Sequence, residues 1–546
     1  MDTIIFLTIY FIITISILGY GLFFSRLINI NFFSLNYGYI GLIGISFLVL
    51  ISYISHMFLA HNYLHNVILH ICGILFFLFF HFKNKANSTG DIKILIFVFL
   101  IFLIAIFLSK NNEDFPYYHF PFVWNLVQNK LQFGQGLFNL GYRHHSSLLY
   151  FNSLTYLPFV KYYLFTSTNL IFFSLINLIF FQKVLEKQKE EKFDFIFFLS
   201  LFFLIFFISI FNRLADFGTD KAGQMIAILL VVQSLEIINL KHDIQKIKLN
   251  FQVIIILLLL LITLKVYFLI YSLLIFLIIY QLQDKLELFK TIFFSKITVF
   301  GFILLLSFVI LNVSNNGCII YPISSTCFID VFPWSLDKES LEAQNIWLQQ
   351  WAKGGAGPNF RIENPEIYIQ KLNWVSHWIG FYFFTKVSDF LLSLTLIVLI
   401  LSVFFFRKKN KEEKIVYFKL IYIYILCIFL YWFYKHPQLR YGGFNIIALI
   451  IFIPLSIRFS NSIMEYKSKR KAVFFLIFLS LSIFLTKNAI RIKNEFERND
   501  QYKYINFPFY YISEENLNSG LNDPEEIKKK YHINTKVING YTIYYR

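Results

Sequence analysis

The chain has 546 residues, of which 57% are hydrophobic and only 15% are charged. Soluble domains carry about 25% charged residues, so this composition excludes a soluble protein and predicts an all-α, polytopic bundle of membrane helices. The formal net charge of +17 is concentrated in short loops between apolar runs, as in the cytoplasmic loops of membrane proteins. We therefore expect no nucleic-acid partner.

Apolar runs along the chain predict where it crosses the membrane. A spanning helix needs about 20 apolar residues, or fewer if it is partly sheltered, and this rule gives about fourteen spans. In chain order they cover residues 3–24, 39–59, 66–82, 92–109, 162–181, 193–211, 222–240, 251–264, 267–280, 297–312, 379–406, 416–434, 444–457 and 472–486. The eighth and ninth runs are short and flank Lys265, so they could form a hairpin or one kinked helix.

Clusters of lysine and arginine decide between these two possibilities. The positive-inside rule places such clusters in the cytoplasm. They occur within residues 183–192, 241–248, 285–296, 407–414 and 467–471. All of them fall on one face of the membrane only if Lys265 lies in a turn between two helices, which favours the hairpin. We expect a multi-pass protein of the bacterial inner (cell) membrane.

This orientation divides the chain into five parts. The acidic loop at 110–161 and the C-terminal tail at 487–546 both lie outside the cytoplasm. The parts are accessory transmembrane helices at 1–91, a core at 92–312 that contains an acidic extracytoplasmic loop at 110–161, an extracytoplasmic loop at 313–378, transmembrane helices at 379–486 and an extracytoplasmic tail at 487–546.

The loop at 313–378 begins with two cysteines, Cys318 and Cys327, on either side of a turn that contains Pro322. Two cysteines in an oxidising compartment predict a disulfide. A metal site is the alternative, but no further cysteine or histidine ligands lie nearby in the sequence. The disulfide would fix the start of the long loop.

The acidic loop offers more reactive side chains than any other segment. Glu113 and Asp114 directly follow the fourth span, and the amphipathic stretches 118–133 and 145–160 predict helices that lie in the membrane interface. A carboxylate at this depth could act as a general base on a hydroxyl of a lipid substrate, with the neighbouring acid coupled to its titration. The alternative is a pair of solvated boundary charges.

Several basic residues outside the membrane could bind an anion. Arg143, with His144 and His145, follows the acidic pair, and an arginine can hold a phosphate with two hydrogen bonds. Lys265 in the hairpin turn and Arg440 in an ordered turn are further candidates, although each could instead be a snorkelling anchor. Asp216, Asp220 and Lys221 are interpreted as ordinary loop charges.

The arrangement resembles the GT-C superfamily of integral membrane glycosyltransferases. The resemblance rests on Glu113 and Asp114, placed between two juxtamembrane segments in a large extracytoplasmic loop. It implies an acidic catalytic motif there, a polyprenyl-phosphate-linked sugar as donor, and basic residues on the phosphate. In that superfamily the loop usually follows the first span, whereas here it follows the fourth, so about the first 90 residues would be an added helical unit.

The chain also resembles an uncharacterised group of bacterial multi-spanning membrane proteins. That likeness rests on residues 114–119, 143–158, the Cys318–Cys327 pair and the run 439–441.

The GT-C resemblance implies a glycosyltransferase that uses a lipid-linked donor and a glycan or lipid acceptor at the outer face of the membrane. Asp114 would be the general base, and Glu113 would tune it or hold a divalent cation, the one cofactor considered. The donor phosphate would be bound by Arg143, Lys265 and Arg440, and His119, His144 and His145 would orient the substrates. The alternatives are a lipid-linked polysaccharide polymerase or ligase, a transporter or flippase, and a membrane protein without catalytic activity.

Overall fold

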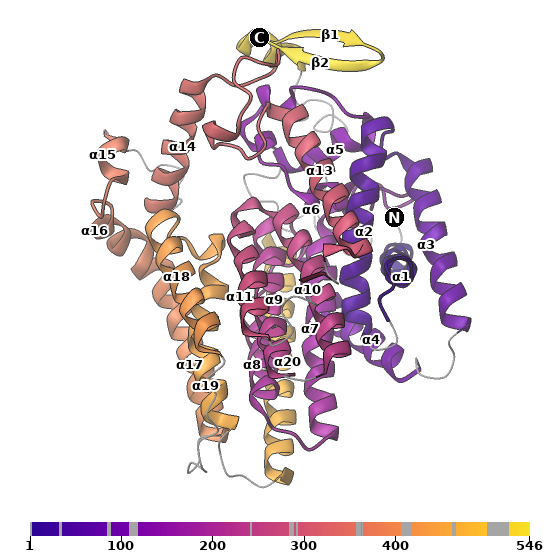
Figure 1. Ribbon diagram of the computed structural model, residues 1–546, viewed down its shortest axis with the longest axis vertical. Helices are drawn as coiled ribbons and strands as arrows, with labels where there is room; N and C mark the ends of the chain where they lie inside the picture. The colour runs from indigo at the N-terminus through magenta and orange to yellow at the C-terminus, as the bar shows by residue number, and fades with distance from the viewer. Residues whose placement is uncertain are drawn as a thin grey trace.

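The computed structural model describes residues 3–31, 35–83, 89–108, 118–240, 243–282, 289–290, 293–355, 362, 364–405, 418–460, 466–498 and 524–546. These residues are mostly helical, and the sheet within them has two strands (Figure 1).

The first half of the chain consists of helices that surround a buried centre. Its elements are α1 (Thr3–Leu27), α2 (Tyr37–Phe58), α3 (Tyr63–Lys83), α4 (Thr89–Phe102), α5 (Phe120–Gln128), α6 (Ser147–Ser153), α7 (Thr168–Lys189), α8 (Phe195–Ile210), α9 (Thr219–Asn239), α10 (Ile244–Leu264), the 3-10 segment η7 (Val266–Ser272) and α11 (Leu273–Gln281).

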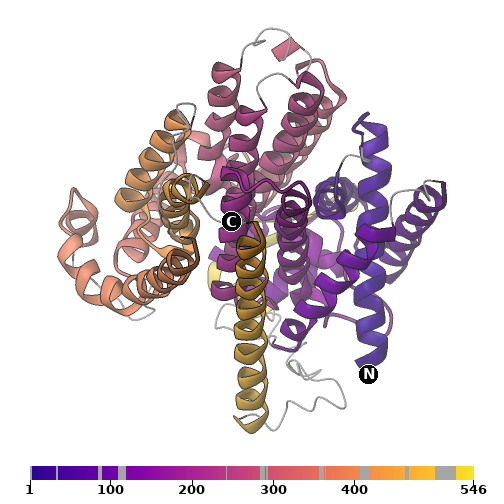
Figure 2. The same ribbon diagram turned by 90° about the horizontal axis from the view of Figure 1, so that it is seen from below.

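The second half adds helices on one flank and a small cap. Its elements are α13 (Lys296–Asn316), α14 (Lys338–Lys353), α15 (Pro365–Ile369), α16 (Val375–Trp378), α17 (Ser388–Phe405), α18 (Lys419–Lys435), α19 (Gly443–Ser460), α20 (Tyr466–Arg498), α22 (Pro524–Tyr531), β1 (Asn534–Ile538) and β2 (Tyr541–Tyr545). Seen from below, α1–α4 and α16–α19 lie on opposite sides of the central helices (Figure 2).

Hydropathy and helix length support a multi-pass membrane protein. In the described chain, ten helices are long and apolar enough to cross a membrane. Every expected span coincides with a helix, but α4, α8, α18 and the segment from η7 to α11 do not reach that length. The number of fourteen spans therefore remains a prediction. The break expected at Lys265 is present, because α10 ends at Leu264 and Lys265 is extended.

The centre of the fold is formed by α8 and α9. Helix α8 buries nearly all its side chains, as expected for a helix that is apolar all round. Helix α9 is buried without interruption from Ala222 to Leu235. The N-terminal helices pack unusually closely, since a Cβ on Gly19 would lie 1.8 Å from the carbonyl oxygen of Gly73 on α3. Small residues allow helix backbones to approach in this way within a membrane.

The two stretches expected as interfacial helices form α5 and α6, which are much shorter than 118–133 and 145–160. All seven residues of α6 are buried. This second helix is therefore covered by protein, because α2, α5 and α10 pack against it. Its depth in the membrane remains a prediction. The amphipathic pattern arises instead from polar side chains that bond within the protein, such as Ser153 with His61 of the loop before α3.

A small cap lies at the upper end of the molecule in Figure 1, where the β-hairpin packs against the 3-10 turn η4 (Gln135–Leu137). Cys318 and Cys327 form a disulfide there. Strand β2 pairs with Phe133 through two backbone hydrogen bonds, from Phe133 to Thr542 and from Tyr544 to Phe133. The hairpin thus supports the loop that leads from α5 toward Arg143.

Candidate functional site

A cavity of about 940 Å³ lies between α14 and α18 on one side and η7 and the 143–149 segment on the other. It is large enough for a substantial organic ligand. All six residues expected to bind substrate line it, although they come from four separate places in the chain: His119, Arg143, His144, His145, Lys265 and Arg440.

Arg143 forms part of the wall and is held by the loop around it. Its Nε donates to the carbonyl oxygen of Gly136 at 2.7 Å, and its Nη1 donates to the hydroxyl of Tyr321 at 3.4 Å. Asn316 donates to the backbone oxygen of Arg143 at 2.9 Å. These contacts fix the backbone and one edge of the guanidinium, and leave other N–H groups to meet a ligand.

His144 exposes its imidazole to the cavity and contacts the Tyr321 ring edge-on at 5.1 Å. Burial of the site and the charges of Lys265 and Arg143 lower the pKa of His144 to about 4. The ring is therefore neutral at pH 7, so it can donate one hydrogen bond and accept another.

His145 and Ser146 connect this segment to its neighbours. The His145 ring packs against Tyr150 and Phe308, and its Nε2 has no hydrogen-bond partner among the residues that the structure describes. Burial lowers the pKa of His145 to about 3. Ser146 donates to the carbonyl oxygen of Leu264 at 2.7 Å, directly before Lys265. His119, at the start of α5, stacks on Phe217 at 5.9 Å.

The second group of cations surrounds Tyr441. The Lys265 Nζ lies 4.4 Å from the centre of the Tyr441 ring, and the Arg440 guanidinium lies 4.8 Å from it. Arg440 also donates to the Tyr441 hydroxyl at 2.8 Å. Lys265 forms an ion pair with Asp220, and about 24% of each side chain remains exposed. Burial opposes the charge of Arg440, but Tyr441 and Asp220 outweigh it and raise the pKa of Arg440.

Helix α9 sets the positions of both cations. Asp220 and Gln224 lie four residues apart and so share one helix face. Asp220 pairs with Lys265, and Gln224 donates to the backbone oxygen of Arg440 at 3.0 Å. Gly223 lies against Phe268 of η7, where an added Cβ would be only 2.4 Å from that ring. A glycine is therefore required for η7 to approach α9.

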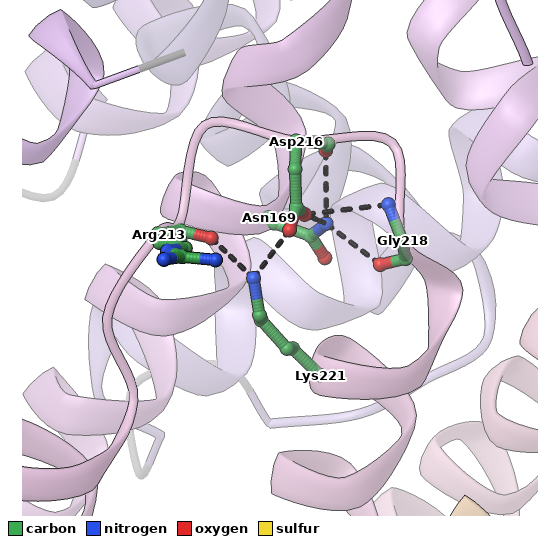
Figure 3. A network of polar contacts seen from close by, with 5 residues as sticks. All are labelled: Asn169, Arg213, Asp216, Gly218 and Lys221. Atoms are coloured by element: carbon green, nitrogen blue, oxygen red, sulfur yellow. Dashed lines mark hydrogen bonds and ion pairs between the residues drawn. The ribbon is translucent and has the colours of Figure 1, made fainter. Parts of the chain in front are cut away.

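The turn before α9 is held by a separate polar network (Figure 3). The Asn169 amide donates to the backbone oxygen of Asp216 at 3.0 Å, to its carboxylate at 2.8 Å and to the backbone oxygen of Gly218 at 2.8 Å. Lys221 bonds to Asp216 and to the backbone oxygen of Arg213. This network fixes the start of α9 and with it the position of Asp220.

Lys435 and His436 also line the cavity. Burial and the nearby charges of Lys265, Lys353 and Lys435 lower the pKa of His436 to about 4. The site therefore combines permanent cations with neutral imidazoles, an arrangement that suits an anionic ligand.

The opposite wall of the cavity is apolar and continues to the surface. Leu269 and Leu273 line the cavity and are 42% and 53% exposed. Phe276 and Tyr280 extend this row along α11 and are 63% and 68% exposed. Within α11, the spacing of Leu273, Phe276 and Tyr280 puts these three residues on one helix face. An apolar strip thus leads from the cavity to the outer surface of the bundle.

Glu113 and Asp114 lie outside the described residues, so their expected catalytic role remains a prediction. Among the described residues, no group of three histidine, cysteine, aspartate or glutamate side chains could hold a metal ion. The divalent cation suggested for Glu113 likewise remains a prediction.

Asp220 is the important residue that the sequence interpretation missed, because it was assigned to loop charges. No signal in the sequence indicated a pairing with Lys265, since an acidic residue in the first turn of a helix is already favoured by the helix dipole. Tyr441 and Lys435 were part of the turn around Arg440 but were given no role.

The fold and cavity define the class of the protein, a multi-pass helical membrane protein with a cationic site that opens toward apolar surface. The chain belongs to the family described as a domain of unknown function, DUF8201, whose model matches residues 1–447. The matched range includes every cavity-lining residue, from Tyr118 to Tyr441. No curated protein and no solved structure matches the chain.

Proposed function

We propose that this protein is a membrane glycosyltransferase. It transfers a sugar from a polyprenyl-phosphate-linked donor to a glycan or lipid acceptor of the cell envelope, on the outer face of the bacterial inner membrane. The observation that carries the proposal is the convergence of Arg143, Lys265 and Arg440 on one cavity with an apolar wall. A lipid phosphate requires both features.

The donor is bound at two places. Its phosphate contacts the cations around Tyr441 and Arg143, and its isoprenoid chain lies along the apolar strip from Leu269 to Tyr280. A lipid already in the membrane can reach the cavity along this strip without entering water. His119 and the neutral His144 orient the sugar or the acceptor through hydrogen bonds.

The reaction is a direct displacement with inversion. The acceptor hydroxyl oxygen bonds to the anomeric carbon of the sugar while the bond from that carbon to the phosphate oxygen breaks. The phosphate leaves on its lipid with the bonding electrons, and the hydroxyl proton passes to Asp114 as general base. The cations stabilise the charge that develops on the phosphate, and Glu113 tunes Asp114 or holds a divalent cation.

The length of the chain is consistent with this role for Asp114. Asp114 precedes Tyr118 by four residues, and Tyr118 lines the cavity. Because an extended chain spans at most about 3.6 Å per residue, the two Cα atoms are no more than about 14 Å apart.

The test uses the full-length protein in nanodiscs with polyprenyl-phosphate sugars as donors and envelope lipids or glycans as acceptors. Asp114→Asn should reduce transfer by about 100-fold or more, since general bases contribute at least that factor. Donor binding should persist. Asp194→Asn is the control, because Asp194 pairs with Lys187 far from the cavity and asparagine retains its helix cap. Full transfer by folded Asp114→Asn protein would overturn the proposal.

A flippase is a second candidate, because a lipid that follows the apolar strip to the cations of the cavity could also be moved across the membrane. The same purified protein would be reconstituted into liposomes for this test. Movement of the donor lipid between leaflets without any transfer of sugar would favour this candidate. A lipid-linked polysaccharide polymerase would instead be identified by products that contain more than one added unit.

A further inference from the structure

The cavity has an unbalanced charge. The lining residues in the described chain include four basic side chains, Arg143, Lys265, Lys435 and Arg440, and one carboxylate, Asp220. That carboxylate is attracted by Lys265, Arg440 and Lys221. It therefore neutralises part of the surface that a phosphate would contact.

The side chain of Lys265 can move more than that of Asp220, its partner in the ion pair. Asp220 is a short side chain at the start of α9, and the Asn169–Asp216–Lys221 network fixes the turn before it. Lys265 carries its ammonium on a flexible four-carbon chain, and its backbone lies in the extended break between helices. The ammonium can therefore move away from the carboxylate, while the carboxylate cannot follow it.

We propose that Asp220 is an exchangeable counter-ion for the anion-binding site. The phosphate of the ligand takes Lys265 from Asp220 when it binds, and Asp220 takes Lys265 back when the product leaves. This inference rests on the proposed function, in that the ligand is a lipid phosphate. Asp220 thereby limits the affinity of the site, which speeds release of the lipid phosphate product.

The exchange predicts that removing the Asp220 charge strengthens binding of the anion, whereas loss of a polar group from a binding site usually weakens binding. Without the Asp220 charge, Lys265 and Arg440 retain their full attraction for a phosphate. At the effective dielectric constant of a partly buried site, one charge several ångströms away changes binding by about tenfold or more. Asp220→Asn should therefore bind the anion more tightly, not less.

The experiment measures binding of farnesyl phosphate, a short soluble lipid phosphate, to the purified full-length protein. Asp220→Asn should bind it about tenfold more tightly than wild type, and Asp220→Glu should resemble wild type. Uncharged farnesol should bind all variants equally. Asp194→Asn, which also removes one ion-paired charge, should match wild type. Binding of inorganic phosphate distinguishes a lipid-phosphate site from a free-phosphate site. In a free-phosphate site, Asp220→Asn would increase the affinity for inorganic phosphate as much as the affinity for farnesyl phosphate.

A double-mutant cycle keeps the idea testable if Asp220→Asn protein is unstable. In a Lys265→Gln background, Asp220→Ser should change farnesyl phosphate affinity much less than it does with Lys265 present. Equal or weaker binding by folded Asp220→Asn protein, or an equal change in both backgrounds, would overturn the proposal. Failure of the glycosyltransferase function would look different, because the affinity gain would remain while no sugar transfer occurred.

Discussion

The hydroxyl of Ser146 donates a hydrogen bond to the carbonyl oxygen of Leu264 at 2.7 Å. This bond joins two parts of the cavity wall that are 118 residues apart in sequence. One part carries His144 and His145, and the other carries Lys265. The hydroxyl of Ser146 thus ties the backbone next to the imidazoles to the backbone next to Lys265.

Replacing this hydroxyl should loosen the site without unfolding the protein. Ser146→Ala removes the bond to Leu264 and also the cap of α6, since Ser146 accepts from the Leu148 N–H. Each such loss costs about 1 kcal/mol. We expect a modest decrease in melting temperature and several-fold weaker farnesyl phosphate binding. Ser146→Thr, which keeps a hydroxyl, should recover most of the affinity, and failure of that rescue would exclude a positioning role.

The close contact of Gly223 with Phe268 gives a second prediction. A methyl group at Gly223 would overlap the Phe268 ring, and overpacking of this kind costs about 1–3 kcal/mol. Gly223→Ala should lower the melting temperature and separate η7, with Lys265, from Asp220. Gly380→Ala is the matched control, because nothing lies within 4 Å of a Cβ at that glycine. Equal melting temperatures for the two variants would contradict this packing argument.

The N-terminal helices should be needed for the cavity wall. The Asn66 amide on α3 donates to the carbonyl oxygens of His61, Ser153 and Tyr156, each at 2.9 Å. Asn66→Leu would leave buried carbonyl groups without partners, at about 1–3 kcal/mol for each. We expect a large loss of thermal stability together with loss of farnesyl phosphate binding.

Asn62→Ala is a milder control for that change. It removes only an exposed cap, in which Asn62 accepts from the His65 N–H, and costs about 1 kcal/mol. If Asn66→Leu left binding intact, the N-terminal helices would have no part in supporting the site.

Acidification should destabilise the protein before its carboxylates titrate. The pKa values of His144 and His436 are lowered to about 4 by burial and nearby cations, whereas unfolded histidine titrates near 6.5. Between these values the unfolded chain binds more protons, so stability is greatest above about pH 6.5 and falls as the pH decreases toward 4. The melting temperature measured from pH 7.5 to 4.5 should follow this course. His144→Gln should make the dependence shallower, and an unchanged slope would exclude His144 as a contributor.

The disulfide should stabilise the wall near Arg143. Cys318 and Cys327 enclose a loop that carries Tyr321, which accepts from Arg143. Closing so short a loop is worth about 2–3 kcal/mol in the chain-entropy account. Paired substitution of both cysteines by serine should lower the melting temperature and weaken anion binding. The same substitution at Cys72, a free cysteine, should have little effect on binding.

Features set by local sequence were predictable. Apolar length placed a helix at every expected span, and the charge pattern required the break at Lys265 that the structure contains. Arg440 was singled out because Pro437 and Gly442 indicate an ordered turn, and Gly442 indeed has a φ of 107°.

Contacts between distant segments were not predictable in the same way. The pairing of Asp220 with Lys265 depends on how α9 packs against η7, and no pattern within either segment specifies that packing. The burial of α6 was missed for the same reason, since an amphipathic pattern does not reveal whether lipid or another helix covers its apolar face. The single sequence also could not show that β2 lies beside Phe133.

The pairing of β2 with Phe133 has a consequence for how the chain is threaded through the bilayer. Two segments bonded through their backbones must occupy the same compartment. Phe133 and the hairpin therefore lie on the same side of the membrane, although α13, α17 and α20 intervene in sequence. Labelling of one engineered cysteine in the hairpin from either side of the membrane would assign the compartment for both, and with it the side on which the Arg143 wall of the cavity is assembled.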